Sequence, residues 1–172
     1  MRERRGSADE GRAQRRGLRG ALASLLALSF WAGAAFAADG LITTRSPYSE
    51  SETMDRFVTV ATNAGMKIFA RIDHAAGAQQ VGRSLRATEV LIFGNPKGGT
   101  PFLECSQTVG IDLPMKLLVW TDESNQVWIG YNDPAWIGRR HGVPSCPAVG
   151  PLSQALAKLV EGAIAREEKE KR

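Results

Sequence analysis

The first 37 residues differ so sharply from the rest of the chain that they limit which part of it can form a folded domain. Met1 to Gly20 carry seven arginines and three acidic residues, whereas the seventeen residues from Ala21 to Ala37 carry no charge. This run ends in small residues spaced as a signal peptidase requires. A basic segment, an apolar segment and small residues in this order are typical of a signal peptide. We therefore expect residues 1–37 to be removed, residues 38–165 to fold as one domain, and residues 166–172 to form a charged tail.

Two features of this leader leave alternatives open. Seventeen apolar residues are also the shortest length that spans a membrane as a helix, so a retained anchor is the alternative to cleavage. Residues 14–19, Gln-Arg-Arg-Gly-Leu-Arg, resemble a twin-arginine export signal. The other interpretation is a chance match within an arginine-rich segment, with export by the general route. Either export route predicts a periplasmic or secreted protein without membrane attachment after cleavage.

The positive charge of the chain lies entirely in the same leader. The whole sequence has a net charge of +4, and the residues after position 37 contain 15 basic and 15 acidic side chains. Proteins that bind nucleic acid need clustered cations, which release counterions from the phosphate backbone. The remaining chain has no excess of cations, so the sequence predicts no nucleic-acid partner.

Hydrophobic patterns after the leader predict an α+β domain with a mainly antiparallel sheet. Ser49 and Glu52 form a capping box at the start of a helix, and the apolar stripe of this helix includes Met54 and Phe57. A polar loop at residues 122–125 predicts a hairpin. A parallel, doubly wound sheet is the alternative. Strands are expected at residues 41–45, 66–72, 89–93, 115–121 and 127–131, and a last helix from Pro151 to Arg166.

The glycine-rich stretch from Gly94 to Pro101 is the first candidate binding segment. It leaves a strand and is expected to enter a helix with Thr100 as cap and Pro101 in the first turn. Free backbone amides at such a helix start, with Asn95, Lys97 and Thr100 nearby, would hold a carboxylate or a phosphate. The stretch lacks the lysine of a phosphate-binding Walker loop. A capped turn without a ligand is the alternative.

Asp73 and His74 form the second candidate, because a carboxylate beside an imidazole can act as an acid–base pair or a metal site. The alternative is that Asp73 caps the following helix and His74 makes a structural hydrogen bond. His141, the other histidine, lies at an expected helix end. The sequence has no metal-binding spacing motif, so we expect no cofactor. A composite metal site of both histidines and a cysteine is the alternative.

Cys105 and Cys146 are the only cysteines of the chain. In an exported protein they can form a disulfide across 41 residues, which would stabilise the fold by about 3–4 kcal/mol. Two free or buried thiols are the alternative.

Five runs within residues 40–142 form a pattern in this order: Phe69 to Ala78, Leu91 to Lys97, Gly110 to Lys116, Val127 to Pro134, and Arg140-His141-Gly142. Together they resemble the domain-of-unknown-function 302 family. The resemblance implies a small α+β fold similar to TATA-binding-protein-like architectures and a homodimer, and it implies no reaction. Cys105 and Cys146 lie outside the matching runs, which leaves open a disulfide particular to this chain.

The sequence leaves three functions open. The first is an exported domain without catalysis that binds a protein partner or a small anionic or apolar ligand, which predicts an apolar concavity beside the Gly94–Thr100 loop. The second is a structural or assembly dimer. The third is a small enzyme that uses Asp73 and His74 as acid and base, and it requires both side chains to converge with Lys97 on one cleft.

Overall fold

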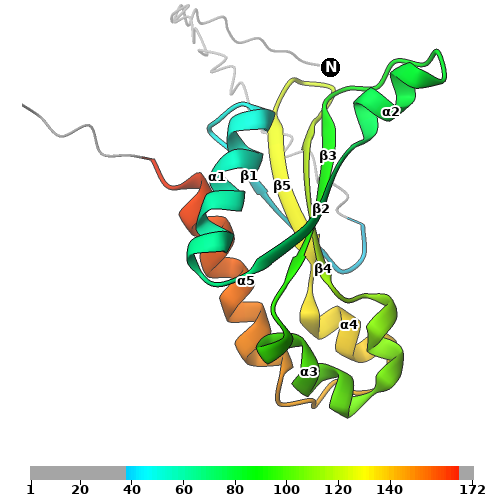
Figure 1. Cartoon of the computed structure of the whole chain (residues 1–172), viewed down its shortest axis with the longest axis vertical. Helices are drawn as coiled ribbons and strands as arrows, with labels where there is room; N and C mark the ends of the chain where they lie inside the picture. The colour runs from blue at the N-terminus through cyan, green and yellow to red at the C-terminus, as the bar shows by residue number, and fades with distance from the viewer. Residues whose placement is uncertain (1–37, 167–172) are drawn as a thin grey trace, which may run out of the picture. The chain divides into compact units, whose positions relative to one another are not determined.

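The structure is a computed structural model, and it describes residues 38–166. These residues form a five-stranded antiparallel sheet in the order β1-β5-β4-β3-β2, with helices packed on it (Figure 1). The prediction of an α+β domain with an antiparallel sheet is confirmed, and the parallel alternative is wrong. The leader, and the tail after residue 166, lie outside the described residues.

The order of elements follows the predicted strands closely. The hairpin of β4 and β5 forms at the predicted polar loop. The strands are β1 (Leu41–Arg45), β2 (Lys67–Asp73), β3 (Thr88–Gly94), β4 (Met115–Thr121) and β5 (Val127–Asn132). The helices are α1 (Glu50–Asn63), α2 (His74–Gln80), α3 (Pro96–Cys105), the 3-10 helix η1 (Gln107–Ile111), α4 (Pro134–Arg140) and α5 (Val149–Ile164).

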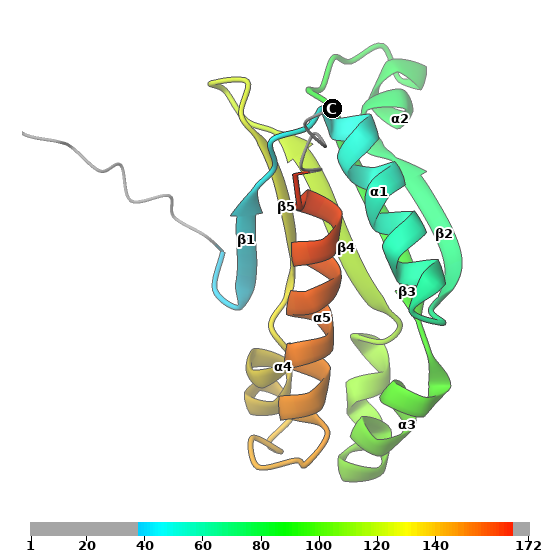
Figure 2. The ribbon, with the colours of Figure 1, turned by 90° about the vertical axis from the view of Figure 1, so that its left-hand side faces the viewer.

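Helices α1 and α5 lie side by side over one face of the sheet (Figure 2). Because side chains alternate along a strand, every second residue in the central parts of β3, β4 and β5 points toward these helices and is buried. Leu91, Leu117 and Ile129 are fully buried in this core. The residues between them point to the other face, where the rings of Trp120 and Trp128 stack with centroids 6.3 Å apart.

Helix α1 begins as the capping box predicts. The Glu52 N–H donates to Ser49 Oγ at 3.3 Å, and Met54 and Phe57 are fully buried. Gly65, just past the end of the helix, has a φ of +76°, a conformation that favours glycine. Helix α5 begins two residues before the predicted Pro151 and ends at Ile164.

The start of α3 was predicted wrongly. The helix begins at Pro96 with Asn95 as its cap, and Pro101 lies inside it. Asn95-Pro96 and Thr100-Pro101 offer the same pairing of a capping residue and a proline in the first turn. The earlier pair comes directly after β3, so the helix starts there and continues through Thr100.

Cys105 at the end of α3 forms a disulfide with Cys146, with their Cα atoms 6.1 Å apart. This is one of the two outcomes that the sequence left open. The bridge joins the segment between β3 and β4 to the loop that connects α4 with α5. Two parts of the chain that are distant in sequence are thereby fixed next to each other.

Candidate functional site

A cavity of about 820 Å³ lies where the end of β3, helix α3, the start of β4 and the first half of α5 meet. Its walls are mainly aliphatic and aromatic carbon. Residues from four parts of the chain contribute, among them Met66, Phe69, Leu103, Leu113, Leu152 and Leu156. The apolar positions of α5 serve two purposes, because Leu156 both lines the cavity and is buried in the core.

Three of the predicted site residues, Asn95, Lys97 and Thr100, line this cavity. The Asn95 side chain connects the start of α3 to the turn after α1. Its Nδ2 donates to the Gly65 carbonyl at 2.8 Å, and its Oδ1 accepts from the Lys97 N–H at 2.9 Å. Lys97 and Thr100 are exposed. The ammonium group of Lys97 is therefore the cationic group that α3 contributes to the edge of an otherwise apolar site.

The backbone amides at the start of α3 are already hydrogen-bonded, so they are not the free donors that the sequence analysis considered for an anion there. The N–H groups of Gly98 and Gly99 both donate to the Asn95 carbonyl at 3.0 Å, and the Lys97 N–H donates to the Asn95 side chain. Capping by Asn95 satisfies the donors that a phosphate or carboxylate would need. An anionic ligand would have to rely on the Lys97 side chain.

Asp73 and His74 lie at the opposite end of the sheet from Lys97 (Figure 1). Lys67 at the start of β2 pairs with Gly94, whereas Asp73 at its end pairs with Glu89, so about 20 Å of strand separates the two ends at about 3.3 Å per residue. Asp73 caps α2, because its Oδ1 accepts from the Ala76 N–H at 2.9 Å. His74 is exposed. The convergence that an acid–base enzyme would require does not form.

The composite metal site is also absent from the described residues. Both cysteines are in the disulfide, and His141 is bonded to other side chains. Between residues 38 and 166, no group of three or more His, Cys, Asp or Glu side chains is arranged to hold a metal ion.

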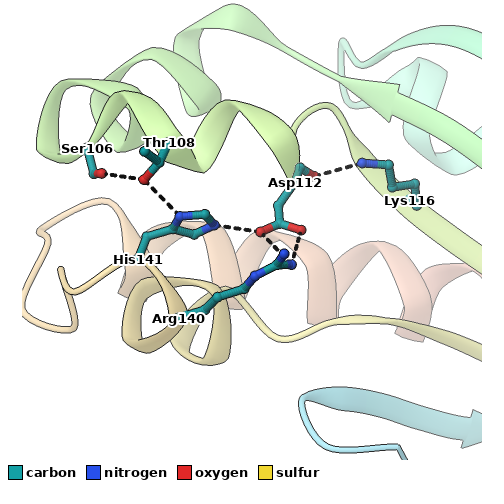
Figure 3. A network of polar contacts seen from close by, with 6 residues as sticks. All are labelled: Ser106, Thr108, Asp112, Lys116, Arg140 and His141. Carbon is teal, nitrogen blue, oxygen red and sulfur yellow. Dashed lines mark hydrogen bonds and ion pairs between the residues drawn. The ribbon is translucent and has the colours of Figure 1, made fainter.

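A polar network that the sequence analysis did not single out joins η1 to α4 (Figure 3). His141 Nε2 lies 2.7 Å from Asp112 Oδ2, and His141 Nδ1 lies 2.9 Å from Thr108 Oγ1. Arg140 Nη1 donates to both oxygens of Asp112 at 3.0 and 3.2 Å, and Ser106 Oγ lies 2.8 Å from Thr108 Oγ1. The network brings a hydroxyl, an imidazole and a carboxylate into one chain of contacts.

The only sequence signal for this network was the family resemblance. Asp112 and His141 are 29 residues apart and belong to two of the matching runs. No spacing rule connects an aspartate before a strand to a histidine after a helix. The fold brings them together because β4 and β5 form a hairpin, which places the residues before β4 beside those after β5.

A second charged cluster ties α1 to the far end of the sheet. Arg71 donates to both carboxylate oxygens of Glu89 at 2.7 and 2.8 Å and also pairs with Asp55, and these bonds raise the pKa of Arg71 above its usual range. Burial, together with a hydrogen bond and charge repulsion from Glu89, raises the pKa of Glu50 to about 7. This cluster lies at the end of β3 away from the cavity, and its contacts join α1 to β2 and β3.

Taken together, these elements define a two-layer α+β domain with one apolar cavity and one polar network at the same end of its sheet. A family described as "Domain of unknown function DUF302" matches residues 42–163, and the chain belongs to this family. A solved structure titled "Crystal structure of uncharacterized conserved protein DUF302 from Bacillus stearothermophilus" has the same fold, with a TM-score of 0.67 and 20% identity. The match covers 73% of this chain and 99% of that one.

Curated relatives are similar over part of their length. Proteins named "Fluoride-specific ion channel FluC 1" from Brucella suis biovar 1 (strain 1330) and Brucella abortus biovar 1 (strain 9-941) are 45% identical over 104 residues. The match covers 60% of this chain and 41% and 38% of those proteins, so the chain spans about two fifths of their length. None of the helices within residues 38–166 has the length and apolar character needed to cross a membrane.

Proposed function

We propose that this domain binds a small, predominantly apolar ligand in the cavity between α3 and α5, without catalysis at that site. The observation that carries the proposal is the cavity itself, whose volume of about 820 Å³ and apolar walls resemble those of small-molecule sites. A concavity of this size with apolar walls is suited to a small molecule whose body is apolar.

The polar groups at the cavity narrow the chemistry of the ligand. Asn95 and the first amides of α3 bond to each other, so they cannot recognise a polar headgroup. The ammonium of Lys97 can pair with a single acidic group at the solvent-exposed edge. The apolar walls and the single ammonium group at the edge favour a ligand with an apolar body, such as a hydrocarbon chain or a fused ring, and at most one anionic end.

The setting of this activity follows from the leader and the disulfide. The leader predicts export, and a structural disulfide persists in the periplasm and outside the cell. We therefore place the binding domain outside the cytoplasm, as the sequence predicts. The family resemblance implies a homodimer. In a homodimer a second copy of the chain would cover the apolar surface in place of a ligand, and this is the alternative outcome of the test.

The test uses 1-anilinonaphthalene-8-sulfonate, a fluorescent probe with an apolar body and one anionic group. Substituting Ala155, which lines the cavity from α5, by phenylalanine places a ring in the space. We expect Ala155→Phe to weaken probe binding at least tenfold, about 1.4 kcal/mol. Gln154→Phe is the matched control, because Gln154 is exposed on the same helix and does not line the cavity.

Equal binding by Ala155→Phe and the native chain would contradict the proposal. If probe binding instead falls as the protein concentration rises and the chain dimerises, the cavity is covered by a second copy of the chain. Sedimentation of the same samples measures the oligomeric state directly, so the two outcomes are distinguished in one experiment.

A second candidate function rests on the curated relatives. Proteins named as fluoride-specific ion channels share 45% identity with this chain over 104 residues. On that basis the domain would be an accessory module that acts beside a fluoride channel. Titration of the isotope-labelled chain with fluoride, with chloride as the control anion, tests whether the domain itself responds to the ion. Backbone amide shifts specific to fluoride would support this role, and identical spectra would count against direct fluoride binding.

A further inference from the structure

The polar network between η1 and α4 has the order of contacts that activates a hydroxyl for nucleophilic attack. A hydroxyl touches one nitrogen of an imidazole, and a carboxylate touches the other nitrogen, at 2.9 and 2.7 Å. The same three roles of nucleophile, base and orienting acid recur on unrelated folds, although there the hydroxyl faces Nε2 and the carboxylate faces Nδ1, whereas here the two nitrogens are exchanged. It is recognised by geometry and roles, so the residue order Thr108, Asp112, His141 is not an obstacle.

The chemistry of the partners fixes where the protons are. An ionised carboxylate only accepts hydrogen bonds, so His141 Nε2 carries the hydrogen that faces Asp112. In the neutral ring with this tautomer, Nδ1 has a lone pair that the Thr108 hydroxyl, 2.9 Å away, is placed to donate to. The Thr108 oxygen is thereby turned toward a base that can take its proton.

The surrounding side chains hold this arrangement in place. The side chains of His141 and Asp112 are 8% and 9% exposed, while Thr108 is exposed and accessible to a substrate. Arg140 Nη1 donates to both oxygens of Asp112 and so holds the carboxylate in position against His141. Lys116 Nζ donates to the Asp112 carbonyl at 3.1 Å and holds the backbone in place (Figure 3).

The disulfide supports the same geometry from outside the network. Cys105 precedes Ser106 directly, and Cys146 lies five residues after His141. The bridge therefore fixes the segment that carries the hydroxyls to the segment that carries the imidazole. Such a site requires precise placement of the reacting groups. A covalent link between the two segments lowers the entropic cost of that placement.

We propose that Thr108 and His141 form a nucleophile–base pair that transfers acyl groups from small carboxylic esters. The Thr108 oxygen bonds to the ester carbonyl carbon as its proton moves to His141 Nδ1. The bond from this carbon to the alcohol oxygen then breaks, and the imidazolium returns the proton to the leaving alcohol. Water, deprotonated by the same nitrogen, hydrolyses the threonyl ester. Asp112 and Arg140 are positioning residues, and the Ser106 hydroxyl contacts the Thr108 oxygen at 2.8 Å.

This proposal stands apart from ligand binding in the cavity, because none of these side chains lines it. The test uses a fluorophosphonate probe on the full chain with its disulfide intact. The Thr108 oxygen attacks phosphorus, fluoride leaves, and the proton goes to His141, so the product is a stable phosphonate ester. Peptide mass spectrometry locates the ester.

We expect one label per chain, on Thr108. Thr108→Val is expected to abolish labelling, and His141→Gln to slow it about 100-fold or more. Thr108→Ser, with a less hindered primary hydroxyl, is expected to label faster than the native chain. Thr59→Val is the matched control, since Thr59 is an exposed threonine on α1 and its change should leave the rate unaltered. For the positioning role, Asp112→Glu is expected to recover part of the rate that Asp112→Asn loses.

Several results would overturn the proposal. Absence of labelling on both the native chain and the folded Thr108→Ser variant would show that the network only ties η1 to α4. A label that persists in Thr108→Val, or a rate that His141→Gln leaves unchanged, would exclude the nucleophile–base pair. An Asp112→Glu variant no faster than Asp112→Asn would remove the positioning role of the carboxylate.

Discussion

The segment between β3 and β4 contributes to two sites of opposite character. Through α3 and Leu113 it lines an apolar cavity, where the backbone amides are already bonded to Asn95. Through η1 and Asp112 it contributes to a network in which each polar group has a defined hydrogen-bond partner. The first site can select by size and apolarity, whereas the second depends on direction and charge. One connecting segment therefore contributes to both the proposed binding site and the proposed reactive network, and none of the side chains of the network lines the cavity.

The largest expected effect comes from removing the disulfide that joins the segment between β3 and β4 to the loop between α4 and α5. Replacing Cys105 and Cys146 by serine removes the bridge across 41 residues and is expected to lower the free energy of unfolding by about 3–4 kcal/mol. Chemical denaturation of the native and variant chains measures the difference. Adding a reductant should destabilise only the native chain. Equal stability of both chains under oxidising conditions would show that the bridge does not constrain the fold.

The next largest effect concerns the network alone. Asp112→Ala leaves His141 and Arg140 without their common acceptor, and the cost of an unsatisfied buried partner is about 1–3 kcal/mol. Glu104→Ala is a matched control at an exposed carboxylate of α3, with an expected change below about 0.5 kcal/mol. Thermal denaturation compares the two variants. A similar small change in both would mean that the network contributes nothing to stability.

A smaller effect depends on pH and acts at the other end of the sheet. The pKa of Glu50 is raised from 4.5 to about 7 in the fold, so the folded state binds a proton more tightly than the unfolded chain does. Stability is therefore highest below pH 4.5 for this group and falls as the pH rises toward 7.

Glu50→Gln removes this titration. We expect the variant to gain stability relative to the native chain between pH 5 and pH 8, by less than about 1 kcal/mol because the side chain is partly solvated. Denaturation curves at several pH values measure the gain. A difference between the two chains that does not change with pH would contradict the raised pKa.

The smallest expected effect sharpens the description of the cavity. Lys97→Ala removes the cation at its edge and is expected to weaken binding of an anionic apolar probe two- to fivefold, about 0.4–1 kcal/mol. Added salt should reduce the difference between the two chains. An uncharged apolar probe should bind both chains equally. If the uncharged probe also binds Lys97→Ala more weakly, Lys97 contributes by packing and not by charge.

Local signals in the sequence predicted much of the fold. The Ser49 cap, the β4–β5 hairpin and the cap at Asp73 all depend on residues close in sequence, and the structure contains each of them. The start of α3 could not be predicted because Asn95 and Thr100 offer equivalent caps, and the choice depends on where β3 ends.

The sites were harder to predict because they depend on distant contacts. The apolar concavity was expected beside Gly94, but its other wall comes from α5, more than 50 residues later. Asp73 and His74 were predicted as a candidate acid–base pair because they are adjacent in sequence. The register of β2 places them at the end of the sheet opposite to Lys97. The pairing of Asp112 with His141 arises only when the hairpin closes.

The proposal that the cavity holds an apolar ligand is tested most directly by nuclear Overhauser contacts between a bound probe and the methyl groups of the protein. With 1-anilinonaphthalene-8-sulfonate, the account predicts contacts from the aromatic protons to the methyls of Leu113, Leu152 and Leu156, which line the cavity. Contacts confined to the opposite sheet face, at Val90 and Leu118, would contradict it.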